Sequence, residues 1–176
     1  MTKRFTAAES SDDLPAPRPN VPIRASEEEE AFVSSEGKRF GFRETVLSRL
    51  AGAEQVHVNR LVVPPGKQSG PFHYHMREEE HFYVLEGRCV LRSGKDRHQL
   101  SSGDYVCFPA GTGVAHAFEN PFDEDCAMLT IGAWDPHEIC VFVDSGKAKL
   151  RAMETIVSWP QESLDYWEGE PVDTPL

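Results

Sequence analysis

Three histidines and one glutamate stand at spacings that could assemble a metal site. Three imidazoles and one carboxylate can bind a divalent metal and still leave coordination positions free for a substrate or for dioxygen. The residue types therefore predict metal-dependent chemistry. The four candidate ligands are His73, His75, Glu80 and His116.

The spacing of these residues suits neighbouring β-strands. Residues i and i+2 of a strand point to the same face, so His73 and His75 are expected to project side by side. Residues 81–85 are aromatic and β-branched and predict a strand that begins at Glu80. A carboxylate at the start of one strand can then meet two imidazoles at the end of its neighbour, and His116 arrives later, after a turn-rich segment.

The two motifs resemble the signatures of the cupin superfamily, approximately Gly-x5-His-x-His-x3-4-Glu-x6-Gly and Gly-x5-Pro-x-Gly-x2-His-x3-Asn. The match extends from about Gly66 to Asn120. Six residues separate Gly66 from His73 where the family usually has five, and four separate Gly111 from His116 where it has two. Both differences fall in loops, so they are expected to change the rim of the site more than the metal.

This resemblance implies an all-β fold, a double-stranded β-helix or jelly-roll barrel. It also implies one divalent metal ion per chain, either Fe, Mn, Zn or Ni, which the sequence does not choose between. The segments 61–66, 109–116 and 144–147 look like a group of small bacterial single-domain cupins. Most of that group have no assigned activity, and some are labelled sugar-phosphate isomerases. The metal residues that the resemblance carries over are His73, His75, Glu80 and His116.

The carboxylate has alternatives, because three glutamates stand in a row. A shift of one residue in the strand register would exchange the faces of neighbouring side chains. Glu80 is favoured because its distance from Gly87 fits the cupin motif, and Glu79 is the fallback. Glu78 is expected to be solvated, and His81 should point away from Glu80 by strand alternation.

Strand parity also predicts the surroundings of the site. With Glu80 facing inward, Phe82 and Val84 should face inward too, and Phe118 should share the face of His116. Together they would give the metal an apolar wall. The outward positions are Tyr83 and Leu85, which could contact a second copy of the chain. Other polar residues are expected to lie outside the site: His57, His98 and His137 at the surface, and Asn120 as a turn-stabilising amide.

Composition narrows the class of protein. A chain of 176 residues suits one domain with a real core. The net charge of −11 and the scattered basic residues argue against nucleic-acid binding. No stretch approaches the roughly 20 apolar residues of a membrane span, and no secretory signal is expected. Three of the four cysteines lie in apolar strand-like runs, which indicates reduced, buried thiols and a cytoplasmic location.

The chain divides into an arm, a barrel and a tail. Residues 1–30 are rich in proline and glutamate and predict a flexible N-terminal arm, unless the arm docks on a neighbouring subunit. Short strands separated by turns predict the cupin β-barrel over residues 31–145. Residues 146–176 predict a short helical or irregular tail, with one possible helix near 150–156. The tail should pack on the barrel or on the partner of a homodimer.

Three functions fit such a site, and no catalytic residue is identified. The favoured one is an Fe(II)-type dioxygenase acting on a small oxygenated, anionic molecule. The second is a metal-dependent isomerase or lyase, in which the metal polarises a carbonyl. It needs an acid–base residue, for which Tyr74 and His57 are available by type, and a phosphorylated sugar would also need Arg60 or Lys67. The third is a non-catalytic cupin that binds a small molecule.

Overall fold

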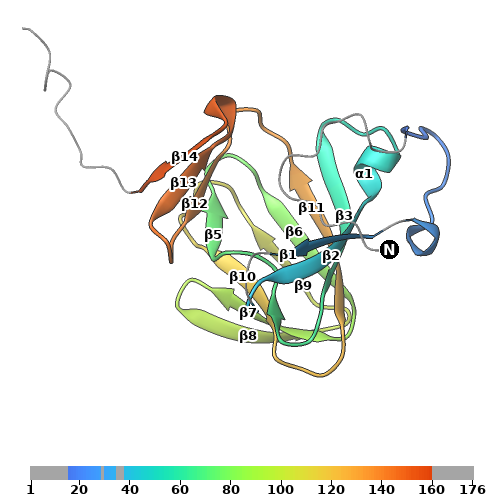
Figure 1. The fold of residues 1–176 in the computed structure, drawn as a ribbon, viewed down its shortest axis with the longest axis horizontal. Coiled ribbons are helices and arrows are strands. Elements are labelled where there is room, and N and C mark those ends of the chain that lie inside the picture. The colour runs from blue at the N-terminus through green and yellow to red at the C-terminus, as the bar shows by residue number, and fades with distance from the viewer. Residues whose placement is uncertain (1–15, 29, 35–37, 160–176) are drawn as a thin grey trace, which may run out of the picture.

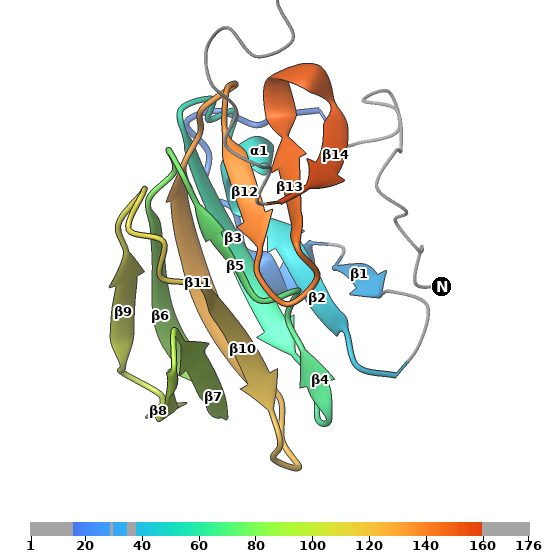
Figure 2. The ribbon, with the colours of Figure 1, turned by 90° about the vertical axis from the view of Figure 1, so that its left-hand side faces the viewer.

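The computed structural model describes residues 16–28, 30–34 and 38–159, and two antiparallel β-sheets face each other in this part of the chain (Figure 1). The first sheet contains, in spatial order, β1 (Ala31–Ser34), β2 (Gly41–Val46), β3 (Val56–Val63), β11 (Cys126–Ala133), β6 (Glu80–Glu86) and β9 (Tyr105–Phe108). Figure 2 shows the last four of these strands side by side, with β9 at the edge.

The second sheet is assembled from the remaining strands. In spatial order these are β14 (Thr155–Ser158), β13 (Lys147–Leu150), β12 (Ile139–Phe142), β5 (His73–His75), β10 (His116–Asn120), β7 (Arg88–Ser93) and β8 (Asp96–Ser101), while β4 (Lys67–Gln68) pairs with β10. Helix is confined to α1 (Leu47–Leu50) and to two 3-10 turns, Ala25–Glu27 and Arg151–Met153, within the described residues. The predicted all-β jelly roll is confirmed.

Side chains from both sheets fill the space between them. The alternation predicted for β6 is confirmed: Phe82 and Val84 are buried in the core, whereas Tyr83 and Leu85 are exposed. Apolar residues that alternate along paired strands bury one face of each sheet and leave the other to water. The core cluster comprises Leu61, Val63, Phe82, Val84, Cys89, Leu91, Phe108, Phe118, Cys126 and Met128.

Gly87 sets the turn between β6 and β7. Its φ is +74°, and a Cβ added there would lie 2.1 Å from the carbonyl oxygen of Asp125. Only glycine fits such a close approach at positive φ. The turn therefore fixes the residue at which β6 ends, and so the position of Glu80 at the other end of that strand. The hairpin predicted next in the chain, β7 with β8, is confirmed.

The described part of the N-terminal arm contacts the barrel. The backbone N–H of Arg18 donates to the carbonyl oxygen of Leu50 at 2.7 Å. Glu30 forms ion pairs with Arg43 and Arg60. Residues 1–15 lie outside the described residues, so the flexible arm stays a prediction.

The prediction of a possible helix near residues 150–156 is wrong. Its place is taken by the end of β13, the 3-10 turn Arg151–Met153 and the start of β14. Glu154 adopts a left-handed conformation, with φ of 48°, and reverses the chain. The β-branched residues Thr155 and Ile156 then pair with β13 and extend the second sheet.

The four cysteines are unpaired, as expected for reduced thiols. Cys89 and Cys126 are buried, and Cys107 and Cys140 are half-buried. Within the described residues, the structure contains no helix that is long and apolar enough to cross a membrane.

Candidate metal centre

Two strands of the second sheet carry the three histidines. His73 and His75 lie on β5, and His73 is the direct partner of His116 on the neighbouring β10. Directly opposed residues of paired strands point to the same face. The ring centroid of His73 lies 5.0 Å from that of His75 and 4.8 Å from that of His116. The three imidazoles thus gather on the inner face of this sheet.

Glu80 reaches them from the opposite sheet, at the start of β6. Its Oε2 lies 3.0 Å from Nε2 of His116 and 3.3 Å from Nε2 of His75. Glu79 instead has a side chain that is 49% exposed, and its Oε1 lies 2.9 Å from Nε2 of His81. The structure therefore brings Glu80 to the histidines and leaves the fallback residue, Glu79, on the outside. We call His73, His75, Glu80 and His116 the inner cluster.

Local backbone contacts fix the strand that carries two of the candidate ligands. The N–H of Gly111 donates to the carbonyl oxygen of His75 at 2.9 Å, so the loop before β10 is attached to β5. Nδ1 of His73 lies 2.7 Å from the carbonyl oxygen of Pro71. A carbonyl only accepts hydrogen bonds, so Nδ1 carries the proton and Nε2 keeps its lone pair for a metal.

Burial and mutual proximity set the charges of the inner cluster. Burial lowers the pKa of His73 to about 4, and the nearby His116 adds to the effect. Burial raises the pKa of the Glu80 carboxyl, but the adjacent His116, His75 and His73 outweigh it and lower that pKa to about 2. At neutral pH, His73 is therefore neutral and Glu80 is ionised. These are the protonation states in which both side chains bind metals.

Several buried atoms of the inner cluster form no hydrogen bond in the described structure. They include both ring nitrogens of His75, both of His116 and Oε2 of Glu80. Buried polar atoms normally have a partner, so a group of them facing one point needs an explanation. A divalent cation among the four side chains would bind Nε2 of His75, Nε2 of His116 and Oε2 of Glu80 together. The residues present therefore fit a metal ion.

An apolar wall covers one side of the inner cluster. The ring of Phe108 stacks on His116 with centroids 3.8 Å apart, and Phe82 meets His116 edge-on at 5.6 Å. Phe118 is buried beside them, with its centroid 4.5 Å from that of Phe82. The inward positions predicted for Phe82 and Phe118 are confirmed, and the wall excludes water from this side.

The geometry agrees with the comparison to known families. Residues 59–132 match the model of the cupin domain family, and this segment contains all four residues of the inner cluster. The chain contains a cupin domain. Its matched segment runs from β3 to the end of β11, so it includes the facing strands that position Glu80 and the three histidines.

The proteins to which this chain is similar are named for different activities. It is 26% identical over 103 residues to quercetin 2,3-dioxygenase of Bacillus subtilis, a match that covers 50% of this chain but only 30% of that enzyme. It superposes on a sugar phosphate isomerase of the cupin superfamily from Silicibacter pomeroyi DSS-3 with a TM-score of 0.64 and 28% identity, covering 71% of this chain and 81% of that one.

A third relative supports the fold alone. The structure of a candidate sugar phosphate isomerase from Acidithiobacillus ferrooxidans gives a TM-score of 0.72 at 22% identity, covering 82% of this chain and 96% of that chain.

A carboxylate that the sequence analysis missed lies behind His75. Glu138 is 2% exposed, and its Oε1 lies 3.3 Å from Nδ1 of His75. Its two oxygens accept the backbone N–H groups of Met76 and Arg77, each at 2.9 Å. A carboxylate held beside Nδ1 favours the proton there and directs Nε2 toward the metal position. The cupin motif gives no signal for Glu138, because it is brought to β5 only by the pairing of β12.

Glu78 was expected to be solvated, and this is wrong. Its side chain is buried; one oxygen accepts the N–H of Asp135 at 2.7 Å, and both oxygens pair with the guanidinium of Arg151. The guanidinium lies 4.0 Å from the centroid of the Trp134 ring. The ion pair joins residues 73 positions apart in the sequence, so the local run of glutamates could not reveal it.

Cys140 is a further neighbour that the sequence analysis did not place at the site. It is the direct strand partner of His75, and its Sγ lies within 4.8 Å of ligand nitrogens of His73 and His75. Burial raises the pKa of the Cys140 thiol to about 12, and the charge of Glu80 adds to the effect. The thiol is therefore protonated at neutral pH.

Other candidates from the sequence lie away from the inner cluster. Tyr74 packs against a small cluster of Phe72, Ala115 and Ala117, and the exposed His57 stacks on Trp134. The expected surface positions of His98 and His137 are confirmed. Tyr74 points to the opposite face of β5 from the two histidines, and His57 lies two strands away from Glu80, with Gly132 between them.

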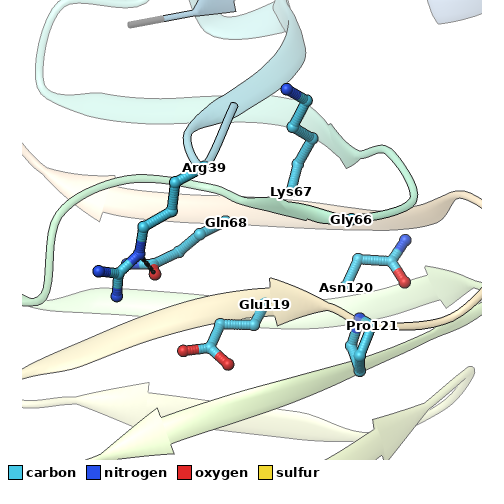
Figure 3. A pocket seen from close by; sticks show the side chains of 7 residues that line it. All are labelled: Arg39, Gly66, Lys67, Gln68, Glu119, Asn120 and Pro121. Atoms are coloured by element: carbon cyan, nitrogen blue, oxygen red, sulfur yellow. Dashed lines mark hydrogen bonds between the residues drawn. The ribbon is translucent and has the colours of Figure 1, made fainter. Parts of the chain in front are cut away.

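Asn120 has the predicted role in a turn. Its Nδ2 donates to the carbonyl oxygens of Val63 and Glu124, both at 2.7 Å, and its Oδ1 accepts the N–H of Phe122 at 3.0 Å. An open pocket of about 270 Å³ lies beside it, at the end of β10 away from His116 (Figure 3). None of the inner cluster lines this pocket. Its lining residues are Arg39, Gly66, Lys67, Gln68, Glu119, Asn120 and Pro121.

Proposed function

We propose that this cupin is a metal-dependent enzyme that acts on a small oxygenated molecule. One divalent ion per chain would be held by Nε2 of each histidine and by the carboxylate of the inner cluster. The observation that carries the proposal is the convergence of these donors from two sheets, where buried atoms of His75, His116 and Glu80 face one another and form no hydrogen bond with other described residues. When bound, the ion supplies Lewis acidity and open coordination positions for a substrate and, in the case of iron, for dioxygen.

The surrounding residues favour a substrate of low charge. Besides Glu80, the buried carboxylates Glu78 and Glu138 lie near His75, and of these only Glu78 is paired with a cation, Arg151. The extra negative charge offsets the positive charge of a divalent ion. A substrate that binds through two neighbouring oxygens, with at most one negative charge, suits this balance better than a phosphate ester.

An Fe(II)-type dioxygenase is the leading assignment. The apolar wall of Phe82, Phe108 and Phe118 keeps water from one side of the metal position. The similarity to quercetin 2,3-dioxygenase over half of the chain supports this reading. Quercetin and related diols are therefore the first substrates to try, although the chain spans less than a third of that enzyme.

A metal-dependent isomerase or lyase is the second candidate, and the resemblance to a sugar phosphate isomerase at 28% identity favours it. The described contacts count against a phosphorylated substrate. Arg60 pairs with Glu30, and Lys67 donates to the carbonyl oxygen of Lys38. Both cations that the sequence offered for phosphate are thus engaged outside the inner cluster.

The first test is elemental analysis of the untagged full chain beside His75→Ala, His116→Ala and the control His98→Ala. We expect at least one equivalent of metal per chain in the wild type and the control, and one equivalent less in the two inner variants. Equal retention in all four proteins would contradict the proposed site.

Oxygen uptake then separates the reactions. The iron-loaded wild type should consume dioxygen with a diol or 2-oxo acid substrate, and His116→Ala should not. Turnover of a hydroxy acid or sugar substrate under anaerobic conditions would instead establish the isomerase or lyase. Metal binding with tight ligand binding and no turnover would make this a non-catalytic cupin. The homodimer remains a prediction, to be checked by light scattering.

A further inference from the structure

A second group of metal-ligating side chains lies on the opposite face of β6 from Glu80. His81 on β6 is the direct partner of Cys107 on the edge strand β9, so their side chains share the outer face of the sheet. Glu79, two residues before His81, lies on that side as well. One ligand atom from each of Glu79, His81 and Cys107 lies within 4.8 Å of the others. We call these three residues the outer cluster.

Contacts within the outer cluster orient its imidazole. Nδ1 of His81 lies 2.7 Å from the hydroxyl of Tyr105, whose ring stacks on the imidazole at 25° with centroids 6.0 Å apart. Nε2 of His81 lies 2.9 Å from the carboxylate of Glu79. The hydroxyl thus holds one ring nitrogen and leaves the other beside the carboxylate. This is how second-layer residues orient histidine ligands in metal sites.

We propose that Glu79, His81 and Cys107 form a second metal site, independent of the inner cluster, that takes Zn²⁺. A thiolate, an imidazole and a carboxylate are all zinc ligands, and three protein ligands leave the fourth tetrahedral position to water. Tetrahedral zinc places its ligands roughly 3.5 Å apart, as follows from its bond lengths. Oε1 of Glu79 already lies 2.9 Å from Nε2 of His81, and all three ligand atoms lie within 4.8 Å of one another, so small side-chain rotations would close the group to this size.

The site is accessible from solution, which separates it from the inner cluster. The side chains of Glu79 and His81 are 49% and 31% exposed, and β9 is the last strand of its sheet. Without a metal, the contact between Glu79 and His81 is a surface ion pair of small energetic value. The cross-strand thiol is what turns this pair into a three-ligand set.

Cobalt titration of the metal-free, reduced full chain tests the proposal. Co²⁺ occupies zinc sites, and a thiolate ligand gives it a near-ultraviolet charge-transfer band that nitrogen and oxygen ligands do not. We expect two equivalents of Co²⁺ per chain and one thiolate band in the wild type. Addition of Zn²⁺ should remove the band. Cys107→Ser and His81→Gln should each lose the band and weaken binding at this site at least tenfold, while the inner equivalent remains.

Two further variants test whether the thiolate band comes from the outer cluster or from the inner cluster. His116→Ala should lose the inner equivalent and keep the band. Cys140→Ser should also keep the band, because Cys140 is the thiol near the inner cluster. A band that disappears in Cys140→Ser and survives in Cys107→Ser would place the thiolate in the inner cluster and overturn the proposal. Absence of any band, with one equivalent bound, would overturn it as well. Retention of the inner equivalent shows that each outer variant is folded.

Discussion

The two faces of β6 carry metal-ligating residues under very different conditions. On the inner face, Glu80 meets histidines from the opposite sheet, and His116 is only 1% exposed. On the outer face, Glu79 and His81 meet Cys107 from the adjacent strand of the same sheet, in contact with water. Consecutive residues thus belong to two clusters, because alternate side chains of a strand point to opposite faces.

The difference lies in how firmly each cluster is held. The inner cluster is fixed by the packing of two sheets, by the Gly111 N–H that donates to the backbone carbonyl oxygen of His75, and by Glu138 behind the His75 imidazole. The outer cluster has the Tyr105 hydroxyl and one strand pairing. A site that is held in its bound geometry loses less entropy on binding. We therefore expect the inner cluster to bind divalent metals more tightly than the outer one, whatever the metal.

Separate replacement of the two neighbouring glutamates by alanine is the strongest test of whether they belong to different clusters. Glu80→Ala should lower the metal affinity of the inner cluster by more than about 100-fold, because it removes the only anionic ligand there. Glu79→Ala should leave that affinity unchanged and weaken the cobalt band of the outer cluster. Metal titration of both variants measures each effect. Loss of inner metal in Glu79→Ala alone would mean that the strand register is wrong by one residue.

The sequence was sufficient where short-range periodicity decides the structure. Alternation along residues 81–85 predicted which side chains of β6 enter the core. The motif spacing predicted that Glu80, and not Glu79, lies beside the histidines. These features depend on residues a few positions apart and on a turn that needs Gly87. The same parity argument placed His81 outside, but by itself it did not reveal Cys107 opposite.

The rest depends on pairings between distant segments. Cys140 and Glu138 come to His75 because β12 pairs with β5, and no local pattern specifies that pairing. Glu78 was misassigned because its partner, Arg151, lies in the tail. The possible helix near residues 150–156 does not form, because pairing of β14 with β13 overrides the helix propensity of these residues.

The Gly87 turn fixes the end of β6, the strand whose two faces carry the two clusters. A substitution there should therefore destabilise the fold on which both clusters depend. Gly87→Ala should lower the free energy of unfolding by more than about 3 kcal/mol, because positive φ and a clash with the Asp125 carbonyl act together. Gly66→Ala is the matched control, since its φ is also positive, +70°, but a Cβ there meets nothing within 4 Å. It should cost about 1–2 kcal/mol. Urea unfolding of both variants measures the difference, and equal losses would contradict the packing argument.

Lowering the pH should decrease the free energy of unfolding of the metal-free chain, because His73 is buried in its neutral form. The pKa of His73 is lowered from 6.5 to about 4, so between these values the unfolded chain binds more protons than the folded one. The free energy of unfolding should then fall as the pH decreases from 6.5 to 4, by at most about 3 kcal/mol, and stop falling on this account below 4. Glu80, with its pKa lowered from 4.5 to about 2, acts in the same direction only at lower pH.

Urea unfolding across this pH range, with a chelator present, measures the His73 effect. His73→Gln should lose the part of the pH dependence between 6.5 and 4, whereas His98→Gln, an exposed control, should keep it. An unchanged slope in His73→Gln would show that this imidazole titrates normally in the folded chain.

The smallest expected effect is on metal affinity, when the carboxylate behind His75 is removed. It tests whether this carboxylate helps to hold the inner cluster in its metal-binding geometry. Glu138→Gln keeps the size of the side chain and removes its charge beside Nδ1 of His75. Loss of such a partner typically weakens metal binding by about 10–100-fold. The affinity of the inner cluster should fall by that factor, while the outer cluster keeps its cobalt band. Glu86→Gln, at an exposed position of β6, should change neither. Equal inner affinity in Glu138→Gln and Glu86→Gln would mean that the imidazoles are held by strand packing alone, and the advantage of the inner cluster over the outer one would then come from burial.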